Sequence, residues 1–248
     1  MEHQLLRTEM LLGRECLERL KSCRVAVFGL GGVGGYAAEA LARSGIGALD
    51  LIDPDRIALT NLNRQILALH STIGQYKTEA AEARIHDIAP DCSVRTYNMF
   101  FLPDTADSLD FSAYDYVIDA VDTVTGKLAI VQKAQEAGVP VISVMGTGNK
   151  LDPSKLHAAD LYETEVCPLA RVMRRECRKR GIESLRVVYS TEEPVRPEKD
   201  PDADGEKRPE SSVPEKRQKD VPGSSAFVPA AAGMIAAAEA VRTLCGRQ

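Results

Sequence analysis

RVAVFGLGGVGGYAAEALARSGIGALDLIDPD, which runs from Arg24 to Asp55, is the stretch that decides the fold. Its residues 25–28 form an apolar run without polar alternation, which is typical of a strand buried on both faces. The Ala-rich residues 36–44 predict a helix, and residues 48–52 predict a second strand. Strand, glycine turn, helix and strand in this order predict one unit of a parallel α/β sheet.

The glycine turn inside this stretch has the spacing of a nucleotide-binding loop. Gly29, Gly31 and Gly34 match G-x-G-x-x-G, Gly32 lies between them, and Asp53 follows Gly34 by 19 residues. Glycines let the backbone approach phosphates, the helix that follows begins with free N–H groups, and an acid at this distance can accept ribose hydroxyls. We therefore predict a nucleotide site. A close-packed turn that binds no ligand is the alternative.

The rest of the chain alternates between predicted helices and strands. Residues 5–20 predict one or two short amphipathic helices with a break at Gly13. Further strands are expected at 93–97, 114–121, 139–145 and 186–190, a strand or turn at 224–228, and helices at 76–88, 123–137, 164–179 and 229–244. This order predicts a doubly wound, Rossmann-like α/β fold with a mainly parallel sheet, a small C-terminal strand and helix extension, and a single domain over residues 1–248.

Composition narrows the class of protein. The chain has 248 residues, is 44% hydrophobic and 27% charged, and carries a net charge of −5, which argues against a surface that grips nucleic acid everywhere but allows a local basic patch. Residues 1–20 are too charged for a signal peptide, and the apolar stretch 226–245 is interrupted by Pro229, Glu239 and Arg242. We therefore expect a cytoplasmic protein without a membrane partner, with 226–245 as a buried helix.

The six cysteines do not form C-x-x-C pairs. They are Cys16, Cys23, Cys92, Cys167, Cys177 and Cys245. This spacing excludes a structural zinc site of paired knuckles. Without an export signal we expect all six to be reduced thiols.

Polar residues also gather in the turn that follows the second predicted strand. Thr60, Asn61, Asn63, Arg64 and Gln65 crowd into one turn, where amides can read a base or ribose and arginine can bind phosphate, or where the same residues can simply cap a helix. Chemistry alone leaves these two interpretations open.

Two further charged positions fit a triphosphate. Lys77 lies in the first turn of a predicted helix, which is unfavourable for the helix dipole unless an anion is nearby. Asp119 and Asp122 lie at the C-terminal end of the buried-type strand predicted at 114–121, at the edge where open parallel sheets bind ligands. Either carboxylate can hold Mg²⁺, and either can instead cap the helix that follows.

Two later segments carry candidate chemistry of another kind. Arg171, Arg174, Arg175, Arg178, Lys179 and Arg180 form a basic cluster, which indicates an anionic partner such as RNA or else a solvated helix face. Cys167 precedes Pro168 at a predicted helix start, where a thiol favours its thiolate form, although a small buried residue is the alternative. Residues 192–223 are charged and proline-rich and predict a mobile loop or lid.

Several of these features together resemble the ubiquitin-activating-enzyme-like superfamily of adenylating enzymes, the ThiF/MoeB/HesA proteins. The matching residues are the Gly29–Gly34 turn, Asp53 with Asp55, the Asn61, Arg64 and Gln65 turn, Lys77 and Asp122. Within it the chain is similar to the tRNA threonylcarbamoyladenosine dehydratase branch, through Asp119-Ala-Val-Asp122, residues 146–164, Pro168-Leu-Ala and residues 187–195.

The resemblance implies a reaction and a set of partners. ATP would activate the side-chain carboxylate of threonylcarbamoyladenosine, next to the tRNA anticodon, as an acyl-adenylate, and the carbamoyl nitrogen would close the ring. It implies a homodimer, because Arg7 matches a family arginine that reaches the partner's ATP site. The family in some cases works with a cysteine desulfurase or sulfur acceptor, and the sequence does not show whether this chain does.

The resemblance also implies roles for the candidate residues. Arg64 and Lys77 are expected on the phosphates, Asp122 on Mg²⁺, and Asp53 on the ribose. The basic helix is then expected to contact tRNA through Arg171, Arg174, Arg175 and Arg178, and residues 192–223 to form a crossover loop. Cys167 lies where related enzymes hold a mobile catalytic cysteine, but ring closure itself requires no enzyme thiol.

Two alternatives remain at this stage. The first keeps the fold and adenylates the C-terminal glycine of a sulfur-carrier protein, although the two C-x-x-C pairs usual in those branches are missing. The second is an NAD-binding redox protein or sensor on a Rossmann scaffold. It predicts nucleotide binding without magnesium.

Overall fold

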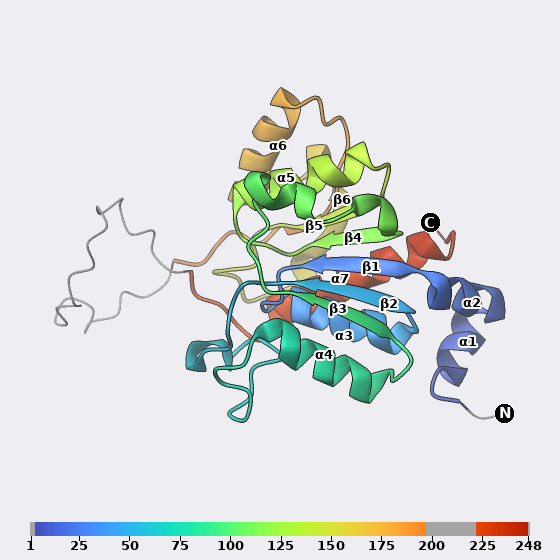
Figure 1. The fold of residues 1–248 in the computed structure, drawn as a ribbon. Coiled ribbons are helices and arrows are strands. Elements are labelled where there is room, and N and C mark those ends of the chain that lie inside the picture. Colours follow the sequence, from blue (N-terminus) through green and yellow to red (C-terminus); the bar gives the residue numbers. More distant parts are fainter. Residues whose placement is uncertain (1–2, 197–221, 248) are drawn as a thin grey trace.

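The computed structural model describes residues 3–196 and 222–247, and these residues build one seven-stranded sheet (Figure 1). The strand order is β3-β2-β1-β4-β5-β7-β6, and every pairing is parallel except that of β6 with β7. The strands are β1 (Arg24–Phe28), β2 (Ala48–Ile52), β3 (Ser93–Tyr97), β4 (Tyr116–Asp119), β5 (Val141–Val144), β6 (Leu156–Asp160) and β7 (Arg186–Ser190). The predicted doubly wound, mainly parallel α/β fold is confirmed.

Helices cover both faces of the sheet (Figure 1). One face carries α3 (Gly34–Ser44), α4 (Lys77–Ile88) and α7 (Phe227–Leu244), and the other carries α5 (Val124–Glu136) and α6 (Pro168–Lys179). The hairpin of α1 (Leu6–Leu12) and α2 (Arg14–Ser22), broken at Gly13, lies at the amino end of β1. Short 3₁₀ turns occur at Leu59–Asn61, Pro103–Ser108, Phe111–Ala113, Pro153–Lys155 and Leu161–Glu163.

The apolar runs in the sequence correspond to strands buried on both faces. Residues 25–28 of β1 are buried, as a continuous apolar run requires, and all five residues of β2 are buried as well, although Asp50 interrupts its apolar sequence. Phe28 packs against Phe101 and Phe111, with ring centroids 4.8 Å and 5.6 Å apart. The first βαβ unit is therefore held by apolar burial along its whole length.

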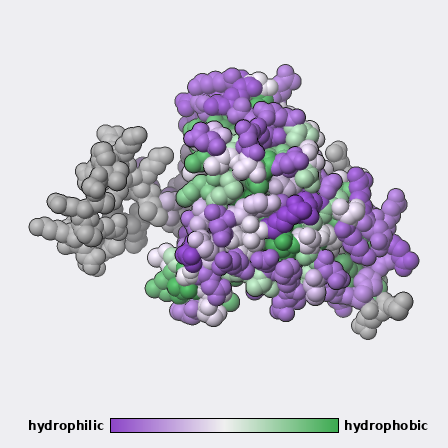
Figure 2. Space-filling model, in the orientation of Figure 1, coloured by the Kyte–Doolittle hydropathy of each residue, from purple (hydrophilic) through white to green (hydrophobic). Residues whose placement is uncertain are grey.

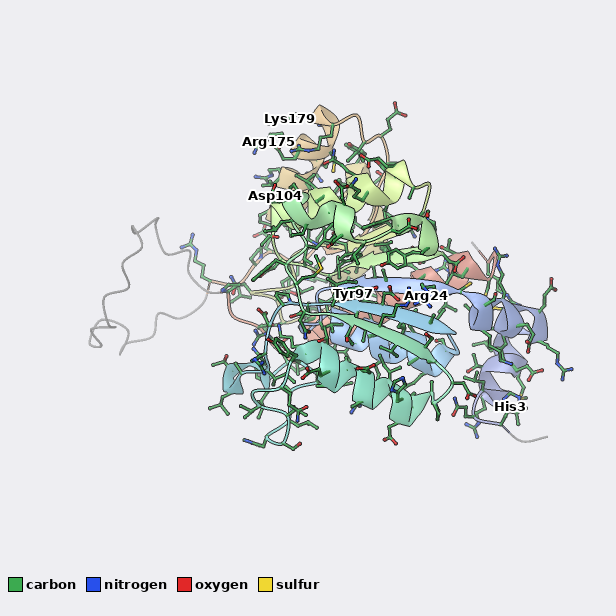
Figure 3. All side chains as sticks on the ribbon, in the orientation of Figure 1. His3, Arg24, Tyr97, Asp104, Arg175 and Lys179 are labelled. Atoms are coloured by element: carbon green, nitrogen blue, oxygen red, sulfur yellow. A yellow bond between two sulfur atoms is a disulfide. The ribbon has the colours of Figure 1, made fainter. Side chains whose placement is uncertain are left out.

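One carboxylate inside the sheet is fully paired. Asp50 on β2 accepts hydrogen bonds from the Arg24 guanidinium at 2.5 Å and from the hydroxyls of Tyr97 and Tyr114 at 3.2 Å each. Arg24 and Tyr97 lie close together over the middle of the sheet in Figure 3. Burial, followed by the charge of Asp50, raises the pKa of Tyr114. Since all partners are satisfied, we treat this cluster as structural.

The C-terminal part of the chain completes the main layers. β7 lies inside the sheet, between β5 and the antiparallel edge strand β6. The strand β6 was not predicted from the sequence. β6 reads LHAAD and has only one buried residue, so it lacks both the apolar run and the alternation that mark a strand. Residues 224–226 form no strand, because α7 already begins at Phe227.

α7 is a core helix. By length and composition it could cross a membrane, but 56% of its apolar window is buried inside the protein. It packs against α3 and the sheet, and a Cβ on Gly233 would meet the Val33 carbonyl. The prediction of a buried helix at 226–245 is confirmed.

The cysteines contradict one expectation. Cys16 on α2 and Cys245, directly after α7, form a disulfide across a sequence separation of 229 residues. Cys23, Cys92, Cys167 and Cys177 are buried free thiols. The prediction that all six are reduced was therefore wrong for this pair, because the fold brings the two chain ends together and the sequence cannot show that contact.

Candidate nucleotide and substrate site

The candidate site lies at the carboxyl end of the parallel strands, between β1 and β4, where the strand order reverses direction (Figure 1). Open parallel sheets bind ligands at this switch point, because the loops there diverge and leave a crevice. The turns after β1, β2 and β4 all reach this edge.

The glycine turn is compact because two of its glycines leave no space for a side chain. Gly29 has φ +84°, and a Cβ there would lie 2.8 Å from the Ala120 carbonyl oxygen. A Cβ on Gly34 would overlap the Gly29 carbonyl oxygen, so only glycine lets α3 begin this close to β1. Gly31 has no such neighbour, since the nearest atom to its Cβ position is the Gln65 side-chain nitrogen at 3.9 Å.

Asp53 is fixed beside the turn. It is 4% exposed, and its two oxygens accept hydrogen bonds from the Leu30 N–H at 2.6 Å and the Asp55 N–H at 2.8 Å. These bonds orient a carboxylate at the end of β2 towards the glycine turn. The structure therefore brings together the turn and the acid that the motif predicted.

Lys77 joins the same group. The side chain is buried, and its ammonium lies 2.7 Å from Asp55 and 3.4 Å from Asp53. α4 begins at Lys77, so the lysine occupies the first turn as predicted. The two carboxylates provide the negative charge that a cation needs at this end of a helix.

The amide-rich turn combines both interpretations that chemistry left open. The Asn61 side-chain oxygen accepts the Ala58 N–H at 3.0 Å, and the Arg64 guanidinium donates to Thr60 and Asn63 at 2.9 Å. These are local turn-stabilising bonds. Gln65 differs, because it is 7% exposed and its carbonyl oxygen finds no hydrogen-bond partner among the described residues.

An unpartnered buried acceptor on a side chain that borders Gly31 fits a nucleotide site better than a closed turn. A buried amide oxygen without a donor costs free energy, about 1–3 kcal/mol, unless a ligand supplies the hydrogen bond. The amide nitrogen of the same Gln65 side chain is the nearest atom to the Cβ position of Gly31, at 3.9 Å, so this side chain borders the open part of the glycine turn. The residues present therefore fit ATP.

The loop after β4 separates the roles of its two aspartates. Thr123 caps α5, since its hydroxyl accepts the Gly126 N–H at 3.3 Å, so neither aspartate is needed as the cap. Asp119 is fully buried and bonded inside the sheet, whereas Asp122 is exposed at the site. Of the two carboxylates, only Asp122 is exposed to solvent.

A protein-only metal cage is not present among the described residues, where no three His, Cys, Asp or Glu side chains come together. Mg²⁺ is commonly held by one or two carboxylates and the phosphates of a nucleotide. Asp122 fits that type of site.

The basic residues of α6 differ in how they are used. Arg174 is partly buried and donates to the carbonyl and hydroxyl of Thr164, so its charge supports the loop before α6. Arg171 is exposed, and the Arg178 guanidinium lies 5.2 Å above the Tyr162 ring. Arg175 and Lys179 project away from the body of the protein (Figure 3).

Local ion pairs reduce the charge of this helix. Arg175, Lys179 and Arg180 all contact Glu176, and the hydrogen bonds from Lys179 and Arg180 lower the Glu176 pKa to about 2. The surface over α6 is nevertheless strongly hydrophilic (Figure 2). Exposed pairs of this kind are weak and can exchange partners.

Cys167 lies at the start of α6, as predicted, but it is 1% exposed. Val166 before it has φ 57°, a backbone conformation that a β-branched residue rarely adopts. The burial favours the interpretation of Cys167 as a small packed residue.

The two described ends of the predicted crossover loop meet at the site edge. The Asn149 N–H donates to Gly223 and the Val195 N–H to Asn149, both at 2.7 Å, and the Asn63 amide donates to Ser224 at 3.0 Å. The remainder of the loop, 197–221, lies outside the described residues.

Three buried polar residues near this edge were missed by sequence reasoning. Lys150 is 3% exposed and donates to the Glu192 carbonyl at 2.8 Å, and burial lowers its pKa. The Glu192 carboxylate accepts the N–H groups of Leu151 and Asp152. Lys127 is completely buried on α5, where the only signal was a lysine within the apolar face of a predicted helix.

Arg7 is not part of this site within one chain. It is exposed on α1, at the opposite end of the sheet from the glycine turn (Figure 1). The strand length alone separates the two ends by about 15 Å.

Comparisons with known proteins agree with this geometry. The model of the ThiF family matches residues 4–248. The tRNA threonylcarbamoyladenosine dehydratase of Bacillus subtilis (strain 168) is 42% identical over 98% of this chain and 95% of its own length. The enzyme of the same name from Escherichia coli (strain K12) is 37% identical over 78% of this chain and 75% of its own.

A solved structure gives the same result. The crystal structure of E. coli tRNA N6-threonylcarbamoyladenosine dehydratase, TcdA, in complex with ATP has a TM-score of 0.85 and 32% identity, over 98% of this chain and 94% of that one. The glycine turn, the paired acids and the matches over nearly the whole chain indicate an enzyme that uses ATP. The chain belongs to the ThiF family of adenylating enzymes. The resemblance seen in the sequence is confirmed. The sulfur-carrier and NAD alternatives are not favoured, since the relatives matched over 98% of this chain are named as the dehydratase.

Proposed function

We propose that this chain uses ATP to cyclise the threonylcarbamoyl group of N6-threonylcarbamoyladenosine in tRNA. The observation that carries the proposal is the convergence of the glycine turn, the Lys77 pair with Asp53 and Asp55, and exposed Asp122 at one sheet edge. Relatives that match the chain over nearly its full length carry the name of this dehydratase.

The proposed reaction has two steps. A carboxylate oxygen of the substrate attacks the α-phosphorus of ATP, and the bond to the leaving pyrophosphate breaks. The carbamoyl nitrogen then attacks the activated carbonyl carbon, loses its proton, and releases AMP together with the carboxylate oxygen. The net change is loss of one water from the nucleoside, with ATP converted to AMP and pyrophosphate.

The chain's own residues hold and neutralise the anions that must meet. Lys77 and Arg64 lie where they can balance phosphate charge, and Asp122 would hold Mg²⁺, which when bound would offset the charge on the leaving group. Asp53 takes the ribose, while Asn61 and Gln65 contact the nucleotide beside Gly31 and Gly32.

The substrate side of the site is proposed along α6 and the loop at 192–223. Arg171, Arg175 and Arg178 are exposed and are assigned to tRNA phosphates, while Arg174 is already held by Thr164. Cys167 has no covalent role in this proposal, because neither step requires a thiol.

The assembly is proposed to be a homodimer in which the whole chain, 1–248, acts as one adenylating domain in the cytoplasm. Arg7 cannot serve the site of its own chain, and its place on an exposed helix supports a role in the site of a second copy. A tRNA substrate supports the cytoplasmic location. A sulfur-accepting partner is not required by the proposed chemistry.

Pyrophosphate exchange tests the proposal. The protein is incubated with ATP, Mg²⁺ and labelled pyrophosphate, with threonylcarbamoylated tRNA, unmodified tRNA or a sulfur-carrier protein in separate reactions. We expect exchange into ATP only with the modified tRNA. Exchange that requires a carrier protein would overturn the proposal.

A further inference from the structure

Lys127 is a buried cation that the proposed chemistry does not use. It lies on α5 with no exposed surface, and its ammonium lies 2.7 Å from the Val144 carbonyl, 3.2 Å from Asp119 and 3.3 Å from the Ser143 hydroxyl. These three acceptors account for all three N–H donors of a lysine. Asp119 and Ser143 are likewise without exposed surface, and the Ser143 hydroxyl donates to Asp119.

This network joins the carboxyl ends of two neighbouring strands. Asp119 is the last residue of β4, and Ser143 and Val144 end β5. Backbone pairing between these strands reaches only Asp119 and Ser143, so beyond that point Lys127 links them.

The loop that the network supports carries Asp122. The second Asp119 oxygen accepts the Val121 N–H at 3.2 Å, which fixes the first turn of that loop. The neighbouring Ala120 carbonyl lies against Gly29, within 2.8 Å of the position a Cβ would take there. The same few residues therefore determine where the glycine turn and the Asp122 loop lie relative to each other.

A purely stabilising role does not account for this arrangement. Burying an ion pair costs desolvation free energy that the attraction of the charges often fails to repay, and apolar residues of similar volume stabilise a core at least as well. Two full charges without solvent contact, directly below the exposed end of the sheet, are better explained by a need for one defined loop geometry.

We infer that Lys127 is a positioning residue, which acts through Asp119 and Ser143 to hold the Asp122 loop in the geometry that binds Mg²⁺ together with the nucleotide. It does not touch the reacting atoms. This inference rests on the proposed function and adds to it a residue outside the first contact layer, at the point where a metal ligand must be held to within a fraction of an ångström.

The deciding variant removes both charges at once. Lys127→Met alone leaves a buried carboxylate without a counter-charge and is expected to destabilise the fold, whereas Asp119→Asn with Lys127→Met leaves a neutral network. The matched control is Lys133→Met, which removes a partly exposed lysine on the same helix. Thermal melting establishes that each variant folds.

Three quantities are then measured on the folded proteins. They are the affinity for ATP by calorimetry with and without Mg²⁺, the Mg²⁺ concentration for half-maximal ATP binding, and kcat and KM for ATP in pyrophosphate exchange. For the double variant we expect kcat to fall by about tenfold or more with KM changed less than about threefold. The Mg²⁺ requirement should rise several-fold, and metal-free ATP affinity should stay the same.

Unchanged kcat and unchanged Mg²⁺ requirement in the double variant would overturn the inference. If that variant fails to fold, Ser143→Ala decides the matter, because it removes one link and keeps the ion pair: a raised Mg²⁺ requirement supports the inference, and an unchanged one contradicts it. Failure of the proposed function itself is separate, since the wild-type protein would then show no pyrophosphate exchange with modified tRNA, whereas the Mg²⁺ requirement of ATP binding can still be compared between wild type and variants.

Discussion

The two sides of the sheet use charge in opposite ways. On the β1–β2–β4 side, Asp53, Asp119 and Lys77 are buried, and each is fixed by two or more short contacts. On the α6 side, Arg175, Lys179 and Arg180 share a single exchangeable partner, Glu176, while Arg171 and Arg178 are also exposed. Buried, preorganised charges suit a small ligand whose charge develops at one point. Exposed, interchangeable charges suit a large polyanion that is held at many points.

The largest effect is expected at the metal ligand. Asp122→Ala should lower the pyrophosphate-exchange rate by at least about 100-fold, because loss of the metal removes charge stabilisation from the leaving group. Melting temperature should not change, since Asp122 is exposed. Asp91→Ala, which alters an exposed aspartate at the other end of the sheet, is the control and should be neutral. Normal exchange by Asp122→Ala would remove Asp122 from the site.

The glycine turn offers a matched pair of methyl additions. Gly34→Ala should destabilise the protein by about 1–3 kcal/mol, because the added carbon overlaps the Gly29 carbonyl oxygen. Gly31→Ala should leave stability unchanged, because its nearest neighbour is 3.9 Å away, but should weaken ATP binding. Denaturant melts and calorimetry separate the two. Equal stability losses would show that the turn serves packing alone.

Substitutions of the exposed arginines on α6 should weaken the binding of tRNA and leave the binding of ATP unchanged. Combined charge reversal at Arg171, Arg175 and Arg178 should weaken tRNA binding by about tenfold at moderate salt and flatten its salt dependence, with no change in ATP affinity. Arg19→Glu, at an exposed position of α2, is the control. Binding assays at several salt concentrations measure both effects. If the salt dependence of tRNA affinity did not change, these arginines would not contact the tRNA.

The smallest effect, on stability at low pH, is expected at Glu192. It lies just after β7 and, like Asp53, is a buried carboxylate that accepts backbone N–H groups. Hydrogen bonds from the Leu151 backbone, and then from Asp152, lower its pKa below the ordinary 4.5. Because the folded pKa is depressed, the ionised group contributes stability above about pH 4.5, and this is lost as pH falls through the folded value. Glu192→Gln should make the acid limb of the stability curve shallower. An identical acid limb would contradict this.

How much the sequence could predict follows the same division. The β1–α3–β2 unit and its acids were predicted because their signals are local: an apolar run, glycines at fixed spacing and an aspartate at a set distance. On the other side, β6 is a half-exposed edge strand, and no local pattern distinguishes it from a loop.

Other features depend on contacts between distant residues. The Cys16–Cys245 disulfide joins the two ends of the chain, and the Lys127 network forms only when α5 packs across β4 and β5. Arg174 appeared equivalent to its neighbours in the sequence, but packing against Thr164 separates it from them. Such roles require the tertiary structure.

The central claim is that the buried charges at one edge and the exposed charges along α6 serve one reaction on tRNA. Its most direct test is mass analysis of the nucleosides from threonylcarbamoylated tRNA after incubation with the protein, ATP and Mg²⁺. We predict a nucleoside lighter by one water, formed only when ATP and Mg²⁺ are present. An unchanged nucleoside, from protein that binds ATP normally, would contradict the account.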